Sequence, residues 1–195
     1  MQTAQAARGI VHAVVDVLRA QRQEIAVLGA GSTAAAIVRR LVGMGFEVRV
    51  WDSMRARADA LVPYGARVSR TPAAAVARAS TVITLVRDAD CIAEAMIGPD
   101  GAVKEMQPGT VWLQMTRVGE QHAEAFAALA RTYRLGYVDA QMAGDWEAAE
   151  RGRLIVLASG SESARGQAQP VLDAIGRQTR WIPSPPNGGF LRSHA

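Results

Sequence analysis

Cysteine, aromatic residues and long apolar runs are scarce in this chain of 195 residues. Its single cysteine, Cys91, cannot form an internal disulfide and is typical of a reducing compartment. The formal net charge is +4, but no basic run is interleaved with aromatic residues, so we expect no nucleic-acid partner. No apolar run approaches the length of a membrane span. We therefore expect a cytoplasmic protein without a membrane partner.

What the sequence does contain is a glycine-rich turn between a buried strand and a helix. Ile25–Leu28 is a short apolar run that predicts a strand buried on both faces. Residues 29–34 are rich in glycine and alanine, and residues 35–41 predict a helix. A second strand is predicted over 46–51, and Asp52 follows it. This order is typical of a dinucleotide-binding βαβ unit.

Each part of this unit has a physical role toward a dinucleotide. Gly29 allows the sharp turn, Gly31 leaves room for a pyrophosphate, and the helix start directs unpaired amides at it. Asp52 lies 23 residues after Gly29, where a carboxylate meets the ribose hydroxyls of NAD. We predict a cofactor site that comprises Gly29, Ala30, Gly31, Ser32, Thr33, Ala34 and Asp52. The alternative is a glycine turn that serves only the fold.

The choice between NAD and NADP depends on charges near the adenosine ribose. Asp52 favours NAD because a carboxylate repels a 2′-phosphate. Arg55 and Arg57 follow closely, and they either reach such a phosphate or are solvated helix residues. We predict NAD as the cofactor, and NADP is not excluded.

The rest of the chain alternates between predicted strands and helices, which indicates a doubly wound α/β sheet, parallel or mixed. We expect three parts: an N-terminal helix over 1–23, a dinucleotide-binding domain over 24–183 and a tail over 184–195. Further strands are expected at 66–68, 81–86, 110–115, 137–141 and 153–158, with an extended segment at 179–182. Further helices are expected at 54–61, 120–134 and 162–175, and Thr71-Pro72 predicts another helix start, with a hydroxyl cap and proline at the first helical position. A loop is expected over 142–152.

Polar residues follow two of these strands at the edge where a cofactor crevice lies in such sheets. Arg87 follows the strand that ends at Val86, and Thr116 and Arg117 follow the strand over 110–115. We add Val86, Arg87 and Thr116 to the predicted cofactor residues. Asp88 is expected to cap the next helix rather than act as a catalytic acid. No metal site is predicted.

Several motifs resemble the cofactor domain of β-hydroxyacid dehydrogenases, such as 3-hydroxyisobutyrate dehydrogenase, tartronate semialdehyde reductase and 6-phosphogluconate dehydrogenase; imine reductases are similar. The resemblance covers about residues 24–189. It implies a Rossmann-type domain and hydride transfer between a nicotinamide and a hydroxyl or imine carbon. The motifs are residues 29–34, Gln107-Pro108-Gly109, Gln114-Met115-Thr116, Val138-Asp139-Ala140, Ala148-Ala149, Gly152-Arg153-Leu154 and residues 170–176.

Two substrate-binding segments of that family are altered here. The Asp-x-Ser-Thr segment reads Gln114-Met115-Thr116-Arg117. The resemblance implies that Thr116 and Arg117 bind a substrate carboxylate or hydroxyl. The alternative is that both are polar residues at a strand end that face water. The Ser-Gly-Gly segment reads Ala143-Gly144-Asp145. Gly144 is retained as a substrate-binding residue, and Asp145 is expected to repel an acidic substrate.

The family's catalytic lysine has no counterpart at the expected position. Ser193 stands there, and the only lysine of the chain is Lys104. We therefore name no catalytic residue and expect the helical C-terminal domain of the family to be lacking. Three functions remain: an oxidoreductase for a small hydroxy acid, aldehyde or imine; a non-catalytic dinucleotide-binding scaffold or redox sensor; and a shortened remnant whose glycine turn serves only the fold. In each case we expect a homodimer.

Overall fold

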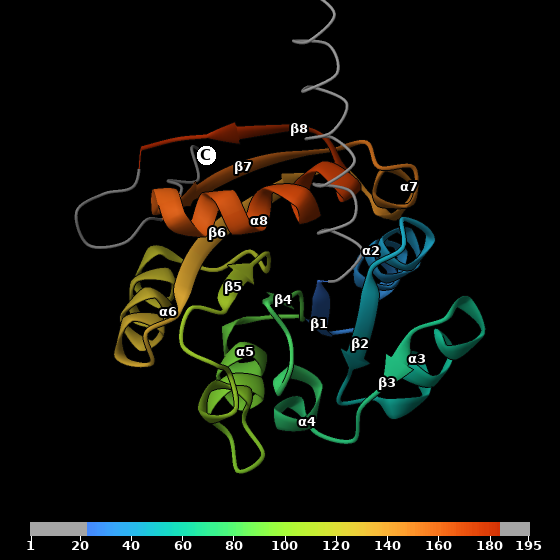
Figure 1. The fold of residues 1–195 in the computed structure, drawn as a ribbon, viewed down its shortest axis with the longest axis horizontal. Coiled ribbons are helices and arrows are strands. Elements are labelled where there is room, and N and C mark those ends of the chain that lie inside the picture. Colours follow the sequence, from blue (N-terminus) through green and yellow to red (C-terminus); the bar gives the residue numbers. More distant parts are fainter. Residues whose placement is uncertain (1–22, 184–195) are drawn as a thin grey trace, which may run out of the picture.

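The predicted alternation of strands and helices is confirmed by a computed structural model, which describes residues 23–183 (Figure 1). Within these residues eight strands form one sheet in the order β3-β2-β1-β4-β5-β6-β7-β8. All neighbouring pairs of this described sheet are parallel except β6 and β7, which are antiparallel, so the sheet is mixed. The strands are β1 (Glu24–Leu28), β2 (Glu47–Trp51), β3 (Arg67–Val68), β4 (Thr81–Thr84), β5 (Val111–Gln114), β6 (Gly136–Ala143), β7 (Leu154–Gly160) and β8 (Gly176–Trp181).

Helices cover both faces of the sheet, as its doubly buried central strands require. Ile25 and Val27 of β1 pack in one core with α2 and α8, whereas Ala26 and Leu28 pack in a second core with α4, α5 and α6. Figure 1 shows the green α4 and α5 on one side of β4 and the orange α8 on the other. The helices are α2 (Ser32–Gly43), α3 (Arg55–Asp59), α4 (Pro72–Val76), α5 (Ala89–Ile97), α6 (Glu120–Thr132), α7 (Trp146–Glu150) and α8 (Glu162–Ile175), with 3₁₀ turns η1 (Val62–Tyr64) and η2 (Ala102–Lys104).

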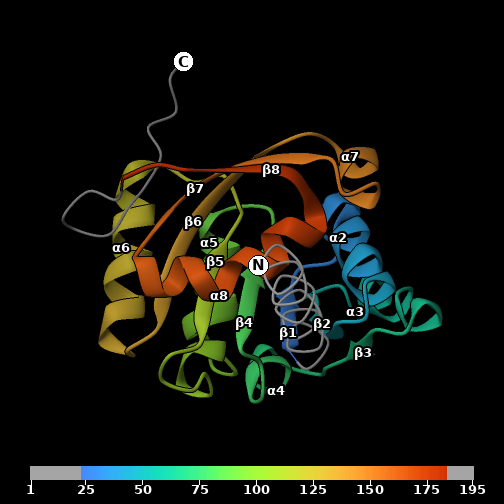
Figure 2. The same ribbon diagram turned by 45° about the horizontal axis from the view of Figure 1, so that its top comes forward.

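The predicted loop over 142–152 is wrong in part, because β6 continues to Ala143 and α7 follows it. Asp145 caps α7 by accepting a hydrogen bond from the Ala148 amide at 2.9 Å. Ala149 is fully buried, and α7 lies beside α2 in both views (Figures 1 and 2). Packing against a distant helix thus stabilises a segment that is too short to form a helix alone.

The expected helix over 54–61 is shorter than predicted and is followed by a separate turn. α3 ends at Asp59, and η1 contains Pro63 at a position that proline favours. Gly65 ends η1 in the left-handed region, with a φ of 100°. Two predicted helix starts are confirmed: Thr71 Oγ1 accepts from the Ala74 amide at 3.1 Å, and Asp88 Oδ1 accepts from the Cys91 amide at 2.8 Å.

The expected N-terminal helix, except Gln23, and the expected tail lie outside the described residues, as does Ser193. The boundaries at 24 and 183 therefore stay a prediction. Among the described helices, none has the length and apolar character needed to cross a membrane.

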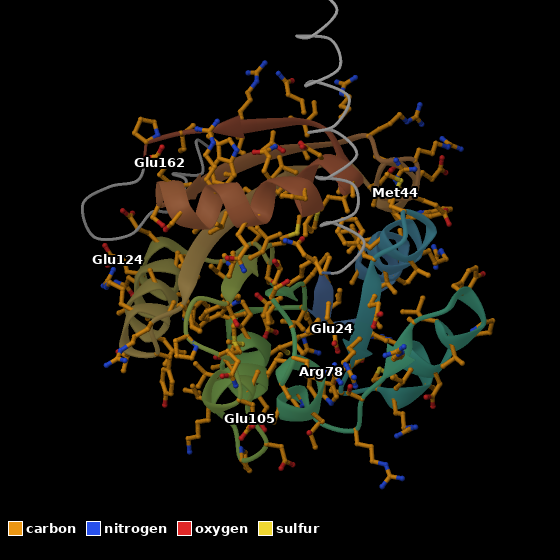
Figure 3. The ribbon with its side chains drawn as sticks, viewed as in Figure 1. Glu24, Met44, Arg78, Glu105, Glu124 and Glu162 are labelled. Atoms are coloured by element: carbon orange, nitrogen blue, oxygen red, sulfur yellow. The ribbon has the colours of Figure 1, made fainter. Side chains whose placement is uncertain are left out.

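Ion pairs stabilise the amino ends of β1 and β2. Glu24 and Glu47 lie opposite each other in the register of the two strands, which would be repulsive without partners. Glu24, whose side chain is 12% exposed, pairs with Arg49 and with Arg78, the latter at 3.6 Å, and Figure 3 shows Glu24 and Arg78 near each other. Arg67 pairs with Glu47 at 3.3 Å. The arginines thus compensate the opposed carboxylates.

Replacing Glu24 by glutamine should lower the free energy of unfolding by about 1 kcal/mol, because a largely buried carboxylate with two arginine partners loses its charge. The loss should shrink in 1 M salt, since the exposed Arg78 contact is screened. Urea unfolding at low and high salt measures both values. Glu105→Gln is the control, because Glu105 is exposed and makes no ion pair within residues 23–183. An equal effect of both substitutions would contradict this account.

Candidate functional site

A cleft of about 570 Å³ lies at the carboxyl ends of β1, β2 and β4. After β1 the chain continues to β2 on one side of β1, whereas β4 lies on the other side of β1. The cleft is therefore at the point where the strand order reverses. Ligands of open α/β sheets bind at such a point. Four segments line the cleft: residues 31–34, residues 51–54 with Arg57, residues 85–87, and Cys91 and Glu94 of α5.

The two glycines of the predicted turn have different roles. Gly29 has a φ of 120°, and a Cβ atom there would lie 2.1 Å from the carbonyl oxygen of Leu85. Only glycine allows the turn to pack so closely against the segment that follows β4. A Cβ atom at Gly31 would meet nothing within 4 Å, although Gly31 lines the cleft. Gly31 therefore leaves open space where a ligand would approach the backbone.

The start of α2 leaves its amides free for a ligand. Gly31 is the N-cap, no side chain caps the helix, and its first turn contains no acidic residue. Four other helices are capped by side chains, namely α4, α5, α7 and α8. Ser32, Thr33 and Ala34 line the cleft, and Ala34 is also packed in the interior at 1% exposure. This helix end favours an anion through its amides and its dipole.

Asp52 joins the loop after β2 to the glycine turn. Its Oδ2 accepts a hydrogen bond from the Ala30 amide at 2.6 Å, and its Oδ1 accepts from the Met54 amide at 2.8 Å. Ala30 does not line the cleft and is only 6% exposed. Asp52 thus holds a carboxylate in the cleft, one strand away from the open space at Gly31.

The loop after β4 carries a cluster of charged and polar groups. Arg87 donates to Asp88 at 2.8 Å and to Cys91 Sγ at 3.3 Å. The Arg87 hydrogen bond, together with the Cys91 amide, holds the pKa of the Asp88 carboxyl well below its usual range. The Asp88 hydrogen bond and burial raise the pKa of the Cys91 thiol. The cleft wall therefore presents a guanidinium and a neutral thiol at pH 7.

The predicted substrate residues do not line this cleft. Thr116 is 2% exposed, and its hydroxyl accepts from the Val86 amide at 3.0 Å. Arg117 is exposed directly after Thr116. Gly144 lies beyond β6 with a φ of 129°, and a Cβ there would lie 2.9 Å from Leu154. Asp145, expected to repel acidic substrates, is the cap of α7.

The structure thus brings most predicted cofactor residues to one cleft and adds residues that sequence reasoning missed. Ser53 and Met54 directly follow Asp52, and Cys91 and Glu94 lie one helical turn apart on α5. The helical spacing after the Asp88 cap was a usable signal for the last two. Lys104, the only lysine of the sequence, lies in η2 in the connection to the amino end of β5, at the opposite edge. Among the described residues, no group of three or more His, Cys, Asp or Glu could hold a metal ion.

The different roles of the two glycines predict different costs of substitution. Gly29→Ala should lower the free energy of unfolding by about 3 kcal/mol, because the methyl group meets Leu85 and the backbone is strained. Gly31→Ala should change it by less than about 1 kcal/mol, since the new methyl group meets open space. Urea unfolding measures both, and similar losses would contradict the assigned roles.

Three comparisons place the chain among known proteins. Residues 24–183 match the family model described as the NAD binding domain of 6-phosphogluconate dehydrogenase. The uncharacterized oxidoreductase YfjR of Bacillus subtilis is 27% identical over 155 residues, which are 80% of this chain and 54% of that protein. The human cytokine-like nuclear factor N-PAC is 26% identical over 160 residues, which are 82% of this chain and 29% of that protein.

The fold is also that of solved dehydrogenases. The structure of Mycobacterium tuberculosis 3-hydroxyisobutyrate dehydrogenase with L-serine has a TM-score of 0.80 and 26% identity, and the match covers 85% of this chain and 56% of that one. The chain thus spans about half the length of YfjR and of this dehydrogenase, and less of N-PAC. Because the family model covers nearly all of the described residues, the chain belongs to the family of the NAD-binding domain of 6-phosphogluconate dehydrogenase.

Proposed function

We propose that the cleft binds NAD and that the chain is the cofactor module of an oxidoreductase for a small hydroxy acid, aldehyde or imine. The observation that carries this proposal is the open space at Gly31 beside the uncapped start of α2. A diphosphate fits there, because amides donate to its oxygens and the helix dipole stabilises its charge. The family match supports the same ligand.

The other cleft residues suggest how the dinucleotide lies. With the diphosphate at residues 29–34, the adenosine ribose would meet the carboxylate of Asp52. Val86 and Arg87 form the opposite wall. The nicotinamide half would then extend toward the carboxyl end of β5, near Thr116 and Arg117.

NAD rather than NADP is proposed on the charges around Asp52. A carboxylate at this place repels a 2′-phosphate, and Asp52 is held by two backbone amides. Arg55 pairs with Asp59 at 3.2 Å and is not part of the cleft lining, whereas Arg57 is. Arg57 is therefore the residue through which NADP would gain affinity.

In the proposed reaction a hydride passes between the nicotinamide and the substrate carbon, to NAD⁺ from a hydroxy acid or from NADH to an aldehyde or imine. The chain binds and orients the cofactor. The exposed guanidinium of Arg117 would bind a substrate carboxylate, and Gly144 would border the substrate. Among the described residues we assign no group to proton transfer. The name of the M. tuberculosis relative, a dehydrogenase of 3-hydroxyisobutyrate whose structure contains L-serine, supports a small hydroxy acid as the substrate class.

A second candidate is a non-catalytic dinucleotide-binding module, either a scaffold or a redox sensor. The position of Lys104 favours it, because the only lysine lies at the sheet edge opposite the cleft. The similarity to N-PAC, whose name describes a nuclear factor, also supports it. This candidate requires the same cofactor affinity but no turnover.

We also propose a cytoplasmic homodimer. Cys91 is a free thiol, which suits a reducing compartment. Trp146 and Leu157 are 46% and 40% exposed, and large apolar side chains of this kind are common in subunit interfaces. Light scattering after size exclusion measures the oligomeric state, and a monomer at micromolar concentration would contradict the dimer.

Calorimetric titration with NAD⁺, NADH, NADP⁺ and NADPH tests the cofactor. We expect binding, with NAD(H) tighter than NADP(H); no heat with any of the four would leave a glycine turn that serves only the fold. A turnover screen with small 3-hydroxy acids, aldehydes and cyclic imines then separates the oxidoreductase from the non-catalytic module.

Asp52→Ala should weaken NAD⁺ binding by roughly tenfold, because the ribose loses its acceptor and the Ala30 amide loses its partner. Calorimetry measures the dissociation constant. Asp59→Ala is the control, since Asp59 carries the same charge on the neighbouring α3 but does not line the cleft. Unchanged affinity of the Asp52 variant would refute its assignment to the ribose.

Gly31→Val should abolish measurable dinucleotide binding while the chain stays folded, because the new side chain fills the proposed diphosphate position. Gly166→Val in α8 is the control, because a Cβ there also meets nothing within 4 Å. Binding and circular dichroism are measured on both variants. A Gly31 variant that binds NAD⁺ as the unsubstituted chain does would place the diphosphate elsewhere.

A further inference from the structure

The hydroxyl of Thr116 is turned into the protein and fully engaged there. Thr116 is 2% exposed, and its Oγ1 accepts a hydrogen bond from the Val86 amide at 3.0 Å. The same oxygen lies 3.3 Å from the Val86 carbonyl and 3.4 Å from the Thr84 carbonyl, to one of which it donates. A hydroxyl in this environment has no free surface for a substrate.

We infer that Thr116 is a positioning residue for the cofactor cleft, which it shapes by holding Val86 against the glycine turn. This inference rests on the proposed function, because it concerns the same cleft. It gives Thr116 an indirect role in place of direct contact with cofactor or substrate.

Val86 needs such a partner because it lies beyond the end of the sheet ladder. β4 ends at Thr84, and the last backbone hydrogen bond to β1 is from the Leu85 amide to the Leu28 carbonyl at 3.0 Å. In the part of the chain that the structure describes, the hydrogen bond of the Val86 amide is to Thr116. The hydroxyl therefore adds one hydrogen bond between the segments after β4 and β5, made through a side chain, beyond the last backbone hydrogen bond of the two strands.

The segment that Thr116 holds is the surface on which the glycine turn lies. A Cβ atom at Gly29 would be 2.1 Å from the Leu85 carbonyl oxygen and 3.2 Å from Val86 Cγ1. Contact this close means that a displacement of Leu85 and Val86 displaces the turn as well. On its other side the turn is held by the Asp52 hydrogen bond to Ala30. The glycine turn is thus held between the segments after β2 and β4, and its contact on the β4 side depends on Thr116.

Gln114 holds the backbone of Thr116 in place. Its side chain is fully buried, and its Oε1 accepts a hydrogen bond from the Thr116 amide at 2.5 Å. This bond fixes the backbone at Thr116, whose hydroxyl accepts from the Val86 amide. A pre-shaped cleft binds a rigid diphosphate more tightly, because less ordering is needed upon binding.

Thr116→Val tests this inference, because valine keeps the shape of the side chain and removes the hydroxyl. We expect the valine variant to bind NAD⁺ roughly tenfold more weakly, because the Val86 amide is left without a partner. A tenfold change corresponds to about 1.4 kcal/mol of binding free energy. Thr116→Ser should restore the affinity. Amide hydrogen exchange by NMR should show faster exchange at Val86 in the valine variant and protection in the serine variant.

Thr110→Val is the matched control. Thr110 is also a buried threonine beside β5, and its hydroxyl donates to the Ala79 carbonyl at 3.2 Å, but at the opposite end of the strand. Both valine variants should lose similar stability, measured by urea unfolding, whereas only the Thr116 variant should lose affinity. A merely structural role would give equal affinities in the two variants and would overturn the inference. If the unsubstituted chain binds no dinucleotide, the proposed function fails instead, and Val86 exchange alone still tests the hydrogen bond.

Discussion

The contact between Gly29 and the Leu85 carbonyl group is the constraint on which the cleft depends. Because Gly29 has no side chain, the turn after β1 lies directly on the segment after β4. Parallel pairing of β1 with both β2 and β4 brings the carboxyl ends of all three strands to one edge. The turn therefore stands between two neighbours, and the space in front of Gly31 is set by backbone geometry rather than by flexible side chains.

Charge and hydrogen bonding give this space its chemical character. The uncapped start of α2 presents amides and a positive dipole end, whereas most other described helices of the chain use a side-chain cap. One strand away, Asp52 places a carboxylate that is itself held by two amides. An anion-binding end beside a fixed acceptor suits a ligand with a diphosphate and a diol. That arrangement is the physical basis of the proposed dinucleotide site.

The fold could be predicted well because its signals are local. The βαβ unit, the helix over 162–175 and the caps at Thr71 and Asp88 follow from apolar runs, glycine and short polar side chains. The short α7 was missed, since its stability comes from burial of Ala149 against a helix more than a hundred residues earlier. The cleft residues Cys91 and Glu94 were missed for a related reason: their exposure to the cleft depends on how α5 packs on the sheet.

By itself the sequence determined where the glycine turn, the first helix and the acidic residue stand along the chain, because glycine conformation, helix starts and apolar runs can be recognised from adjacent residues. Tertiary structure alone decided that Asp52 bonds to the Ala30 amide and that Thr116 turns inward to Val86. Those contacts join residues 22 and 30 positions apart. They depend on which strands pair side by side, and strand order is set by packing across the whole sheet rather than by any local pattern.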